Sequence, residues 1–401
     1  MSKVTVVGRG TVGCLAVAHL WRFTDLEIEW VYDPAIPGQA VGEGTTLYLP
    51  PYLDSVVGMT YPDTQSTWMT MKTGIFKSGW GSKGDYMHAF PLGSHGLHFN
   101  AVALQTLLFE RLSELPRVTT VEGTFQPDSF DTEYVMDCSG SPSSFDDYEQ
   151  IESVPVNACI VFQSDWEHPK FDYTVMEARP HGWAFGIPLQ NRWSIGYLFN
   201  TGISTKEQVF DDAKDMLHDL GLEPTSNRTL YFSNYRRSVN FTSNRSFNGN
   251  ASFFLEPMEA TSTTLAMHVN QMTLNAWLDG QEAVDEMNKN YAEAVEDVQT
   301  MISMHYLAGS VYDTPFWNHA KYIAERHLAS VFERNGESVQ VLSAMLNGQD
   351  TFTSDIGTWG FRSWEQNVSC LGVGDRLLSF VTETGNTPTY ESLPHPLSNP
   401  S

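Results

Sequence analysis

The feature that most constrains this chain is a glycine pattern close to its N-terminus. A short apolar run, Val4 to Val7, precedes Gly8-Arg9-Gly10-Thr11-Val12-Gly13, and an apolar segment with helical spacing follows. In a strand–turn–helix unit the first glycine permits a tight turn, the second lets the backbone approach a pyrophosphate, and the third lets the helix pack on the strand. The free N–H groups at the helix start then bind phosphate. The pattern therefore predicts a dinucleotide-binding βαβ unit.

An acidic residue supports this interpretation. Asp33 lies twenty residues after Gly13, at the end of the next predicted strand, Ile28 to Tyr32. A carboxylate at that position accepts hydrogen bonds from ribose hydroxyls. The alternative, a chance glycine-rich turn, does not account for the strand, the helix and the carboxylate together. The motif alone does not distinguish NAD from FAD.

The composition limits which binding partners and which cellular compartment are expected for this chain. The 401-residue chain carries 48 acidic and 23 basic residues, a formal charge of -25. Nucleic acids and anionic membranes need basic surfaces, so we expect neither as a partner. The four cysteines form no CxxC pair, and His95 and His98 lack an evident third ligand, so we expect no metal. No signal peptide or membrane span is recognisable, which predicts a cytoplasmic location.

Hydrophobic periodicity predicts a mixed α/β (α+β) chain with a Rossmann-like nucleotide-binding domain. Residues 34–90 are rich in glycine and proline and are expected to form long loops, apart from a possible helix at 46–57. The predicted divisions are a discontinuous nucleotide-binding domain (1–150 and 230–280), an antiparallel sheet on the substrate side (151–229), a helical region (281–385) and an extended proline-rich tail (386–401).

Several further segments follow one another along the chain in a characteristic order. They are Val41-Gly42-Glu43-Gly44-Thr45, Gly74-Ile75-Phe76-Lys77, Tyr86-Met87-His88-Ala89-Phe90, Asp137-Cys138-Ser139-Gly140, Trp183-Ala184-Phe185-Gly186-Ile187-Pro188, Phe247-Asn248-Gly249-Asn250-Ala251 and Leu255-Glu256-Pro257-Met258-Glu259-Ala260-Thr261-Ser262. Together with the glycine pattern, they resemble the flavin-dependent halogenases of the tryptophan-halogenase type. The resemblance covers most of residues 1–375. It implies the FAD-binding fold of the aromatic hydroxylases, with an antiparallel substrate sheet and C-terminal helices.

The resemblance implies a set of FAD-binding residues. Asn250 stands where relatives carry aspartate, which leaves a neutral and weaker hydrogen-bonding group at the flavin. The implied cofactor residues are Gly8, Gly10, Thr11, Val12, Gly13, Asp33, Val41, Gly42, Glu43, Gly140, Gly249 and Asn250.

The resemblance also implies Lys77 and Glu259 as catalytic residues. By residue type alone, Lys77 would be a solvated loop lysine and Glu259 a helix-capping carboxylate. In an apolar setting, Lys77 has two possible roles: a neutral amine that forms an N–halogen bond, or an ammonium that hydrogen-bonds hypohalous acid. Thr261 and Ser262 match the halide-binding positions, in an Ala-Thr-Ser sequence where Ser-Thr-Gly is usual. We expect bromide and iodide to be favoured over chloride.

The residues expected to line the substrate site are His88, Phe90, Trp183, Phe185, Pro188 and Trp364. In relatives that halogenate tryptophan, a long insertion follows the Tyr86 to Phe90 segment; here only Pro91-Leu92-Gly93 remains. This difference predicts an open site and a small aromatic substrate of the phenol or indole type. In compactness the chain is similar to members of the family encoded by marine cyanophages, which would place it in a host cytoplasm.

The implied reaction uses FADH2 from a separate flavin reductase, O2 and halide to form hypohalous acid, which Lys77 and Glu259 present to the arene. Two alternatives remain open from the sequence. One is an FAD-dependent aromatic monooxygenase of the same fold, and the other is a non-catalytic flavin-binding protein. The sequence also leaves the oligomeric state open.

Overall fold

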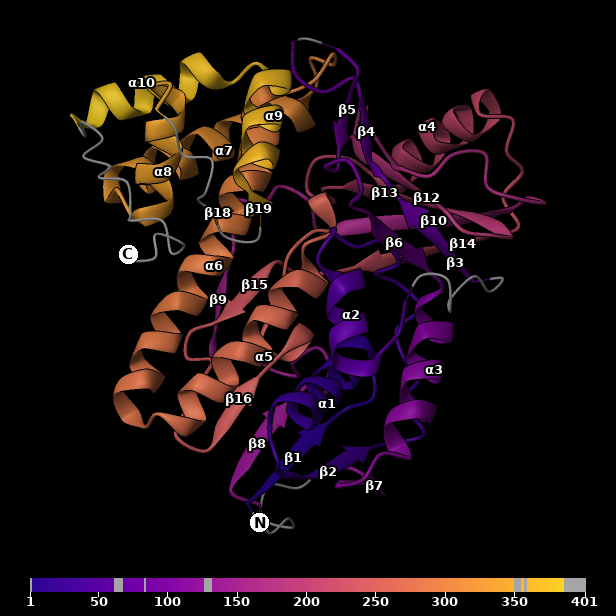
Figure 1. The fold of residues 1–401 in the computed structure, drawn as a ribbon. Helices are drawn as coiled ribbons and strands as arrows, with labels where there is room; N and C mark the ends of the chain where they lie inside the picture. The colour runs from indigo at the N-terminus through magenta and orange to yellow at the C-terminus, as the bar shows by residue number, and fades with distance from the viewer. Residues whose placement is uncertain are drawn as a thin grey trace.

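A computed structural model of the chain describes residues 2–60, 68–82, 84–125, 132–349, 355–356 and 359–385, and the predicted tail 386–401 lies outside these ranges. Figure 1 shows a parallel sheet with its helices in the lower part and an antiparallel sheet above it. A group of helices lies beside both sheets. The predicted mixed α/β fold is confirmed.

The lower sheet has five parallel strands in the order β16-β8-β1-β2-β7. Its core is formed with helices α1 (Thr11–Phe23), α2 (Leu49–Val57), α3 (Ala101–Ser113) and α5 (Ser262–Leu278). The strands are β1 (Lys3–Val7), β2 (Glu27–Tyr32), β7 (Val118–Glu122), β8 (Tyr134–Asp137) and β16 (Arg245–Phe247). The predicted βαβ unit is thus present, since β1, α1 and β2 follow one another and β1 pairs with β2.

Two glycines of the N-terminal pattern are required by close packing. Gly8 has a φ of +100°, and a Cβ there would lie 2.4 Å from the carbonyl oxygen of Cys138. A Cβ on Gly13 would lie 2.1 Å from the carbonyl oxygen of Gly8. Only glycine therefore permits this turn and this approach of α1 to the sheet.

The upper sheet has seven strands in the order β14-β10-β13-β12-β11-β4-β5, all antiparallel except for the parallel pair β11–β4. Its strands are β4 (Gly74–Ser78), β5 (Tyr86–Ala89), β10 (Ala158–Asp165), β11 (Thr174–Arg179), β12 (Gly182–Pro188), β13 (Arg192–Phe199) and β14 (Ser226–Tyr231). The expected antiparallel strands of residues 151–229 are all present.

One part of the sequence interpretation is corrected by this sheet. Residues 34–90 were expected to form loops, but they supply β4 and β5 of this sheet and also β3 (Met69–Lys72), which pairs with β6 (Gly96–Phe99). Short strands rich in glycine, threonine and methionine carry little periodic signal, and partner strands far along the chain stabilise them. Lys77 consequently lies in a buried strand and not in a solvated loop.

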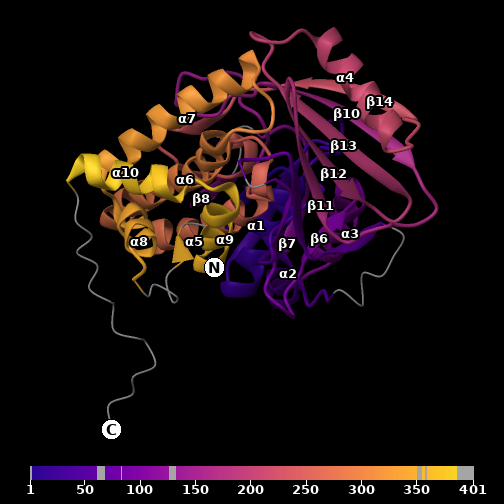
Figure 2. The same ribbon diagram turned by 90° about the horizontal axis from the view of Figure 1, so that it is seen from above.

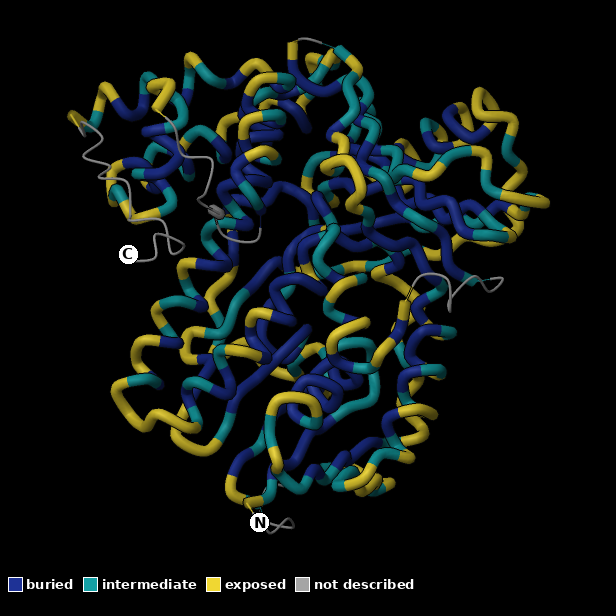
Figure 3. Tube along the Cα trace, in the orientation of Figure 1, coloured by how far each residue is buried: buried dark blue, intermediate teal, exposed yellow. Residues whose placement is uncertain are grey.

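The two faces of the seven-stranded sheet have different coverings. Helix α4 (Lys206–Asp219) packs on the outer face, where Ile160 and Tyr197 contact Val209 and Ala213. Figure 2 shows α4 on the far side of this sheet from the other helices. The inner face, with Met176 and Trp183, belongs to the main core, which includes the long helix α6 (Gln281–Ala308). Figure 3 shows buried segments running through both sheets and along one side of α6.

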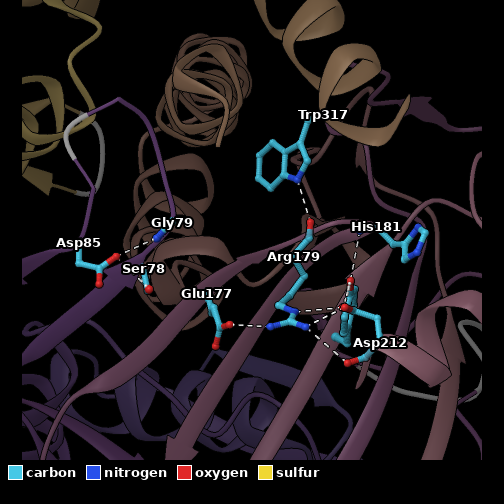
Figure 4. A network of polar contacts seen from close by, with 9 residues as sticks. Ser78, Gly79, Asp85, Glu177, Arg179, His181, Asp212 and Trp317 are labelled. Carbon is cyan, nitrogen blue, oxygen red and sulfur yellow. Dashed lines mark hydrogen bonds and ion pairs between the residues drawn. The ribbon is translucent and has the colours of Figure 1, made fainter. Parts of the chain in front are cut away.

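Polar contacts fix α4 and α7 (Pro315–Arg334) to the end of β11. The Arg179 guanidinium contacts Glu177 at 2.8 Å and Asp212 of α4 at 2.7 Å, and the Trp317 indole of α7 donates to the Arg179 carbonyl oxygen at 2.8 Å (Figure 4). These contacts hold helices on both sides of the sheet.

The remaining elements complete the core around α6 and the edges of the sheets. Within the described ranges, no helix is long and apolar enough to cross a bilayer. These elements are β9 (Tyr148–Gln150), β15 (Tyr235–Arg237), β17 (Phe253–Phe254), α8 (Glu337–Leu346), β18 (Asp355–Ile356), β19 (Trp359–Gly360), α9 (Phe361–Leu371) and α10 (Gly374–Thr384). The division into domains predicted from the sequence remains a prediction.

Candidate active site

A cavity of about 900 Å³ opens at the carboxyl ends of β1 and β2, beside the start of α1. This is the position where open α/β sheets bind nucleotides. Eleven of the twelve predicted cofactor residues line it: Gly8, Gly10, Thr11, Val12, Gly13, Asp33, Val41, Gly42, Gly140, Gly249 and Asn250.

The cavity fits a dinucleotide at three points. Helix α1 begins after Gly10 without a side-chain cap, so its first N–H groups are free for a phosphate. A Cβ on Gly10 would meet no atom within 4 Å, which leaves room for a ligand next to the backbone. The Asp33 carboxylate lies on the cavity wall at the end of β2. FAD would be held here by the turn, the helix start and this carboxylate.

A second cavity, of about 120 Å³, adjoins the first one on the inner face of the seven-stranded sheet. The two cavities share wall residues, among them Phe185, Ser262 and Thr263. The start of α5 thus faces both spaces. Helix α5 also begins without a side-chain cap, so its first N–H groups can donate hydrogen bonds to an anion. Ser262, one of the two residues predicted to bind halide, lines both cavities at this position; Thr261, the other one, lines neither cavity, whereas Thr263 lines both.

The segment before α5 has a strained backbone. Glu259 and Ala260 have φ values of +62° and +56°, in the left-handed region that L-residues rarely adopt. Such strain is of order 1–3 kcal/mol for each residue and is concentrated at functional sites. Here it turns the Glu259 side chain onto the wall of the small cavity, directly before the helix start.

Strand register places three side chains in one row along the inner face of the sheet. Met176 of β11 lies directly opposite Phe185 of β12 and directly opposite Lys77 of β4. Phe185 lines both cavities, Met176 lines only the small one, and Lys77 lines neither. The row therefore leads from the nucleotide cavity to the lysine.

Lys77 and Glu259, both predicted as catalytic, form an ion pair in the core. Their side chains are 0% and 1% exposed. The Lys77 ammonium also donates to the Oδ1 atom of Asn367 at 2.7 Å and to the Nε2 atom of His305 at 2.6 Å. The Nδ1–H group of His305 donates to the carbonyl oxygen of Met301 at 2.8 Å, which leaves Nε2 as an acceptor. All three donor positions of the Lys77 ammonium are therefore occupied.

The Glu259 carboxylate is held in its ionised form. Burial alone would raise its pKa, but the charges of Lys77 and His88 outweigh burial and hold the pKa well below its usual range. The Nδ1 atom of His88 lies 3.0 Å from the second carboxylate oxygen, and the Nε2 atom of His88 is buried with no hydrogen-bond partner. His88, predicted to line the substrate site, thus contacts the carboxylate that was predicted to be catalytic.

A second lysine, which the sequence interpretation missed, lies on the small cavity. Lys72 ends β3, is 1% exposed and lines the cavity together with Glu259. Its ammonium lies 5.6 Å from the centre of the Phe90 ring, and no hydrogen bond or ion pair to it is found among the described residues. Burial lowers the pKa of Lys72 to about 8, although the Glu259 charge opposes this shift. Lys72 lies five residues before Lys77, just outside the Gly74 to Lys77 segment, and this closeness in the sequence was the available signal.

Among the other predicted residues, some line the small cavity and others line neither cavity. Trp183 lines the small cavity, and its indole donates to the Tyr306 hydroxyl at 2.9 Å. Glu43 lines the small cavity instead of the large one, paired with Arg192. Pro188 and Trp364 line neither cavity.

The predicted open site does not extend to the ion pair of Lys77 and Glu259. Although the connection at residues 91–93 is short, His305 of α6 and Asn367 of α9 contact Lys77 directly and help to bury it. These two residues lie 228 and 290 positions from Lys77 in the sequence, which is why the sequence did not reveal this cover.

A glycine-rich nucleotide turn, a parallel sheet and an antiparallel sheet that share one cavity define a dinucleotide-binding class of α/β protein. The family model described as "Tryptophan halogenase" matches residues 3–116 and 111–376. The chain therefore belongs to the tryptophan halogenase family.

Individual relatives agree with this assignment. Tryptophan 7-halogenase RebH of Lentzea aerocolonigenes is 25% identical over 154 residues, which is 36% of this chain and 28% of RebH. The flavin-dependent halogenase Xcc4156 from Xanthomonas campestris has a similar structure, with a TM-score of 0.76 and 19% identity over 96% of this chain and 94% of that one. BrvH, a flavin-dependent halogenase from Brevundimonas sp. BAL3, gives a TM-score of 0.75 and 20% identity over 97% and 98% of the two chains. These structures show the same fold.

Proposed function

We propose that the protein is a flavin-dependent halogenase that places a halogen atom on an electron-rich arene. The observation that carries this proposal is the continuity of the site. A nucleotide cavity adjoins a small cavity at a helix start, and the small cavity is bounded by Glu259 and Lys72. A monooxygenase or a simple flavin-binding protein has no need for a buried carboxylate flanked by two lysines.

FADH2, delivered by a separate flavin reductase, supplies with O2 the oxidising equivalent that converts halide into hypohalous acid. The uncapped start of α5 is the proposed halide site, because Ser262 and Thr263 face both cavities there. The N–H groups of this turn would stabilise an anion without a hydration shell. We retain the expectation that the less strongly hydrated bromide and iodide are favoured over chloride.

The small cavity is the proposed route from this halide site to Glu259. The carboxylate is ionised and fixed by Lys77, so it can orient hypohalous acid and accept the proton that the halogenated ring loses. Lys77 was predicted to act on the halogen directly. Since its ammonium already has three acceptors, we assign it the role of holding Glu259 in place.

Lys72 is then the proposed lysine for the halogen. It faces the cavity, it has no competing hydrogen bond among the described residues, and its lowered pKa leaves a neutral fraction near pH 8. As an ammonium it would donate to the oxygen of hypohalous acid and make the halogen more electrophilic. As an amine it would form an N–halogen bond.

The proposed substrate is a small aromatic molecule of the phenol or indole type that approaches Glu259 from the side of His88 and Phe90. Trp183 and Phe185 stand on the other side, between the cofactor cavity and the arene. A cytoplasmic location remains part of this proposal.

The test is product analysis by mass spectrometry. The whole protein, FAD, a flavin reductase and O2 are supplied with a panel of phenols and indoles and with each halide in turn. Halogenated products that require halide are expected. Hydroxylated products that form equally without halide would establish the monooxygenase alternative instead.

A further inference from the structure

A thioether lies on the proposed route between the halide site and Glu259. Met176 is at the centre of β11, where its neighbours across the sheet are Phe185 on one side and Lys77 on the other. The residue is 2% exposed, and it forms part of the wall of the small cavity. An oxidant that enters this cavity would therefore meet the Met176 side chain on the cavity wall.

We propose that Met176 is a modification site, at which hypohalous acid made by the protein oxidises the thioether to a sulfoxide when no arene is present. The inference rests on the proposed function. The sulfur attacks the halogen atom, an S–X bond forms, the X–O bond breaks and hydroxide leaves. Water then adds to sulfur, halide leaves with the S–X electron pair, and two protons are released. Sulfur loses two electrons and the halogen is reduced to halide.

The neighbouring thiols are less exposed to this reaction. Cys138 and Cys159 line the large cavity, but burial raises the pKa of both. Because the thiolate is the reactive form of cysteine, their protonated thiols react slowly. A thioether has no proton to lose and stays nucleophilic at every pH. Among these sulfur groups, Met176 is therefore the one expected to react.

Oxidation at this position would also affect later turnovers. A sulfoxide is polar and larger than the thioether, and it would stand beside the apolar Phe185 ring on the cavity wall. Both the width and the polarity of the passage would change. Met176 would then set how many turnovers the protein completes without substrate.

The experiment follows the protein during turnover without an arene. The whole protein is incubated with FAD, a flavin reductase, bromide and O2, digested, and analysed by mass spectrometry. A gain of one oxygen atom is expected at Met176. The internal control is Met216, which is 3% exposed but packs on the outer face of the sheet.

Two variants test whether oxidation of Met176 slows later turnovers. Met176→Leu conserves volume. After incubation without arene, it is expected to lose less of its own initial halogenation rate than the wild-type protein does. Met216→Leu is expected to lose as much as wild type. If either variant fails to fold, the wild-type mass analysis alone decides.

A soluble diketone that captures hypohalous acid is added to the same mixture as a trap. It tests the proposed function and the oxidation of Met176 separately. A halogenated trap together with unmodified Met176 would overturn this inference and leave the proposed function standing. Oxidation of Met176 that is equal without bromide, or oxidation confined to Trp183, would also overturn it. If neither the trap nor any phenol or indole of the panel is halogenated, the proposed function and this inference are both overturned.

Discussion

Glu259 accepts the ammonium of Lys77 in an ion pair buried from solvent, yet only Glu259 reaches the wall of the small cavity. The ion pair thus joins a lysine in the core to a carboxylate on the cavity wall. Lys77 contacts the carboxylate from within the core, and Lys72 lines the same small cavity as Glu259.

The two lysines are expected to respond to substitution in opposite ways. Lys77→Met leaves Glu259 buried without its main partner, which typically destabilises a protein by about 3–5 kcal/mol. Lys72→Met removes a buried charge that has no ion pair among the described residues, so the free energy of unfolding is expected to rise. Both variants should lose halogenation while still binding FAD. Denaturant unfolding and flavin absorbance titration measure the two properties, and a destabilised Lys72→Met protein would contradict the assignment.

The difference in the free energy of unfolding between the wild-type protein and Lys72→Met should depend on pH. The pKa of Lys72 is about 8 in the folded protein and 10.5 for an unperturbed lysine, so the buried charge destabilises the folded protein by about 3 kcal/mol below pH 8. Between these values the unfolded chain binds more protons, and the wild-type free energy of unfolding therefore rises with pH. Unfolding of wild type and Lys72→Met at about pH 7 and about pH 10 should show a smaller difference at the higher pH. A constant difference would refute the lowered pKa.

The glycine turn should be essential for the cofactor. Gly13→Ala places a Cβ 2.1 Å from the carbonyl oxygen of Gly8, so α1 must move away from β1. Flavin titration should show at least a tenfold weaker affinity, which corresponds to about 1.4 kcal/mol. Gly336→Ala, at a position with no atom within 4 Å of the added Cβ, is the matched control. Equal affinity of the two variants would argue against this cavity as the FAD site.

The position of the Phe185 ring should control the passage between the two cavities. Gly196 lies directly opposite Phe185, and a Cβ there would be 2.3 Å from the ring. Gly196→Ala must displace the ring, at an expected loss of about 1–3 kcal/mol for overpacking. Product formation for each O2 consumed should fall, as measured with an oxygen electrode and chromatography. An unchanged ratio would mean that Phe185 does not shape the route.

The nucleotide-binding part of the fold could be predicted from the sequence because its signals are local. The turn from Gly8 to Gly13 and Asp33 at the next strand end lie within one βαβ unit, and the spacing fixes their geometry. The same holds for Glu259 at the start of α5, in a segment that the sequence already sets beside a helix.

The environment of Lys77 could not be predicted in this way. Its strand pairs in parallel with β11, and its ammonium contacts His305 and Asn367, which are 228 and 290 positions away. No local pattern encodes such contacts, so a short glycine-rich strand was interpreted as a loop. The same long-range pairing places Met176 between Phe185 and Lys77.

The most direct test of the central claim separates formation of the oxidant from its use. Glu259→Gln and wild-type protein are supplied with FAD, reductase, bromide and O2, and halogenation of a soluble trap and of a phenol or indole substrate is measured in each. The account predicts that Glu259→Gln still halogenates the trap but loses most halogenation of the arene, because the proton acceptor beside the cavity is gone. Arene halogenation at the wild-type rate would contradict it.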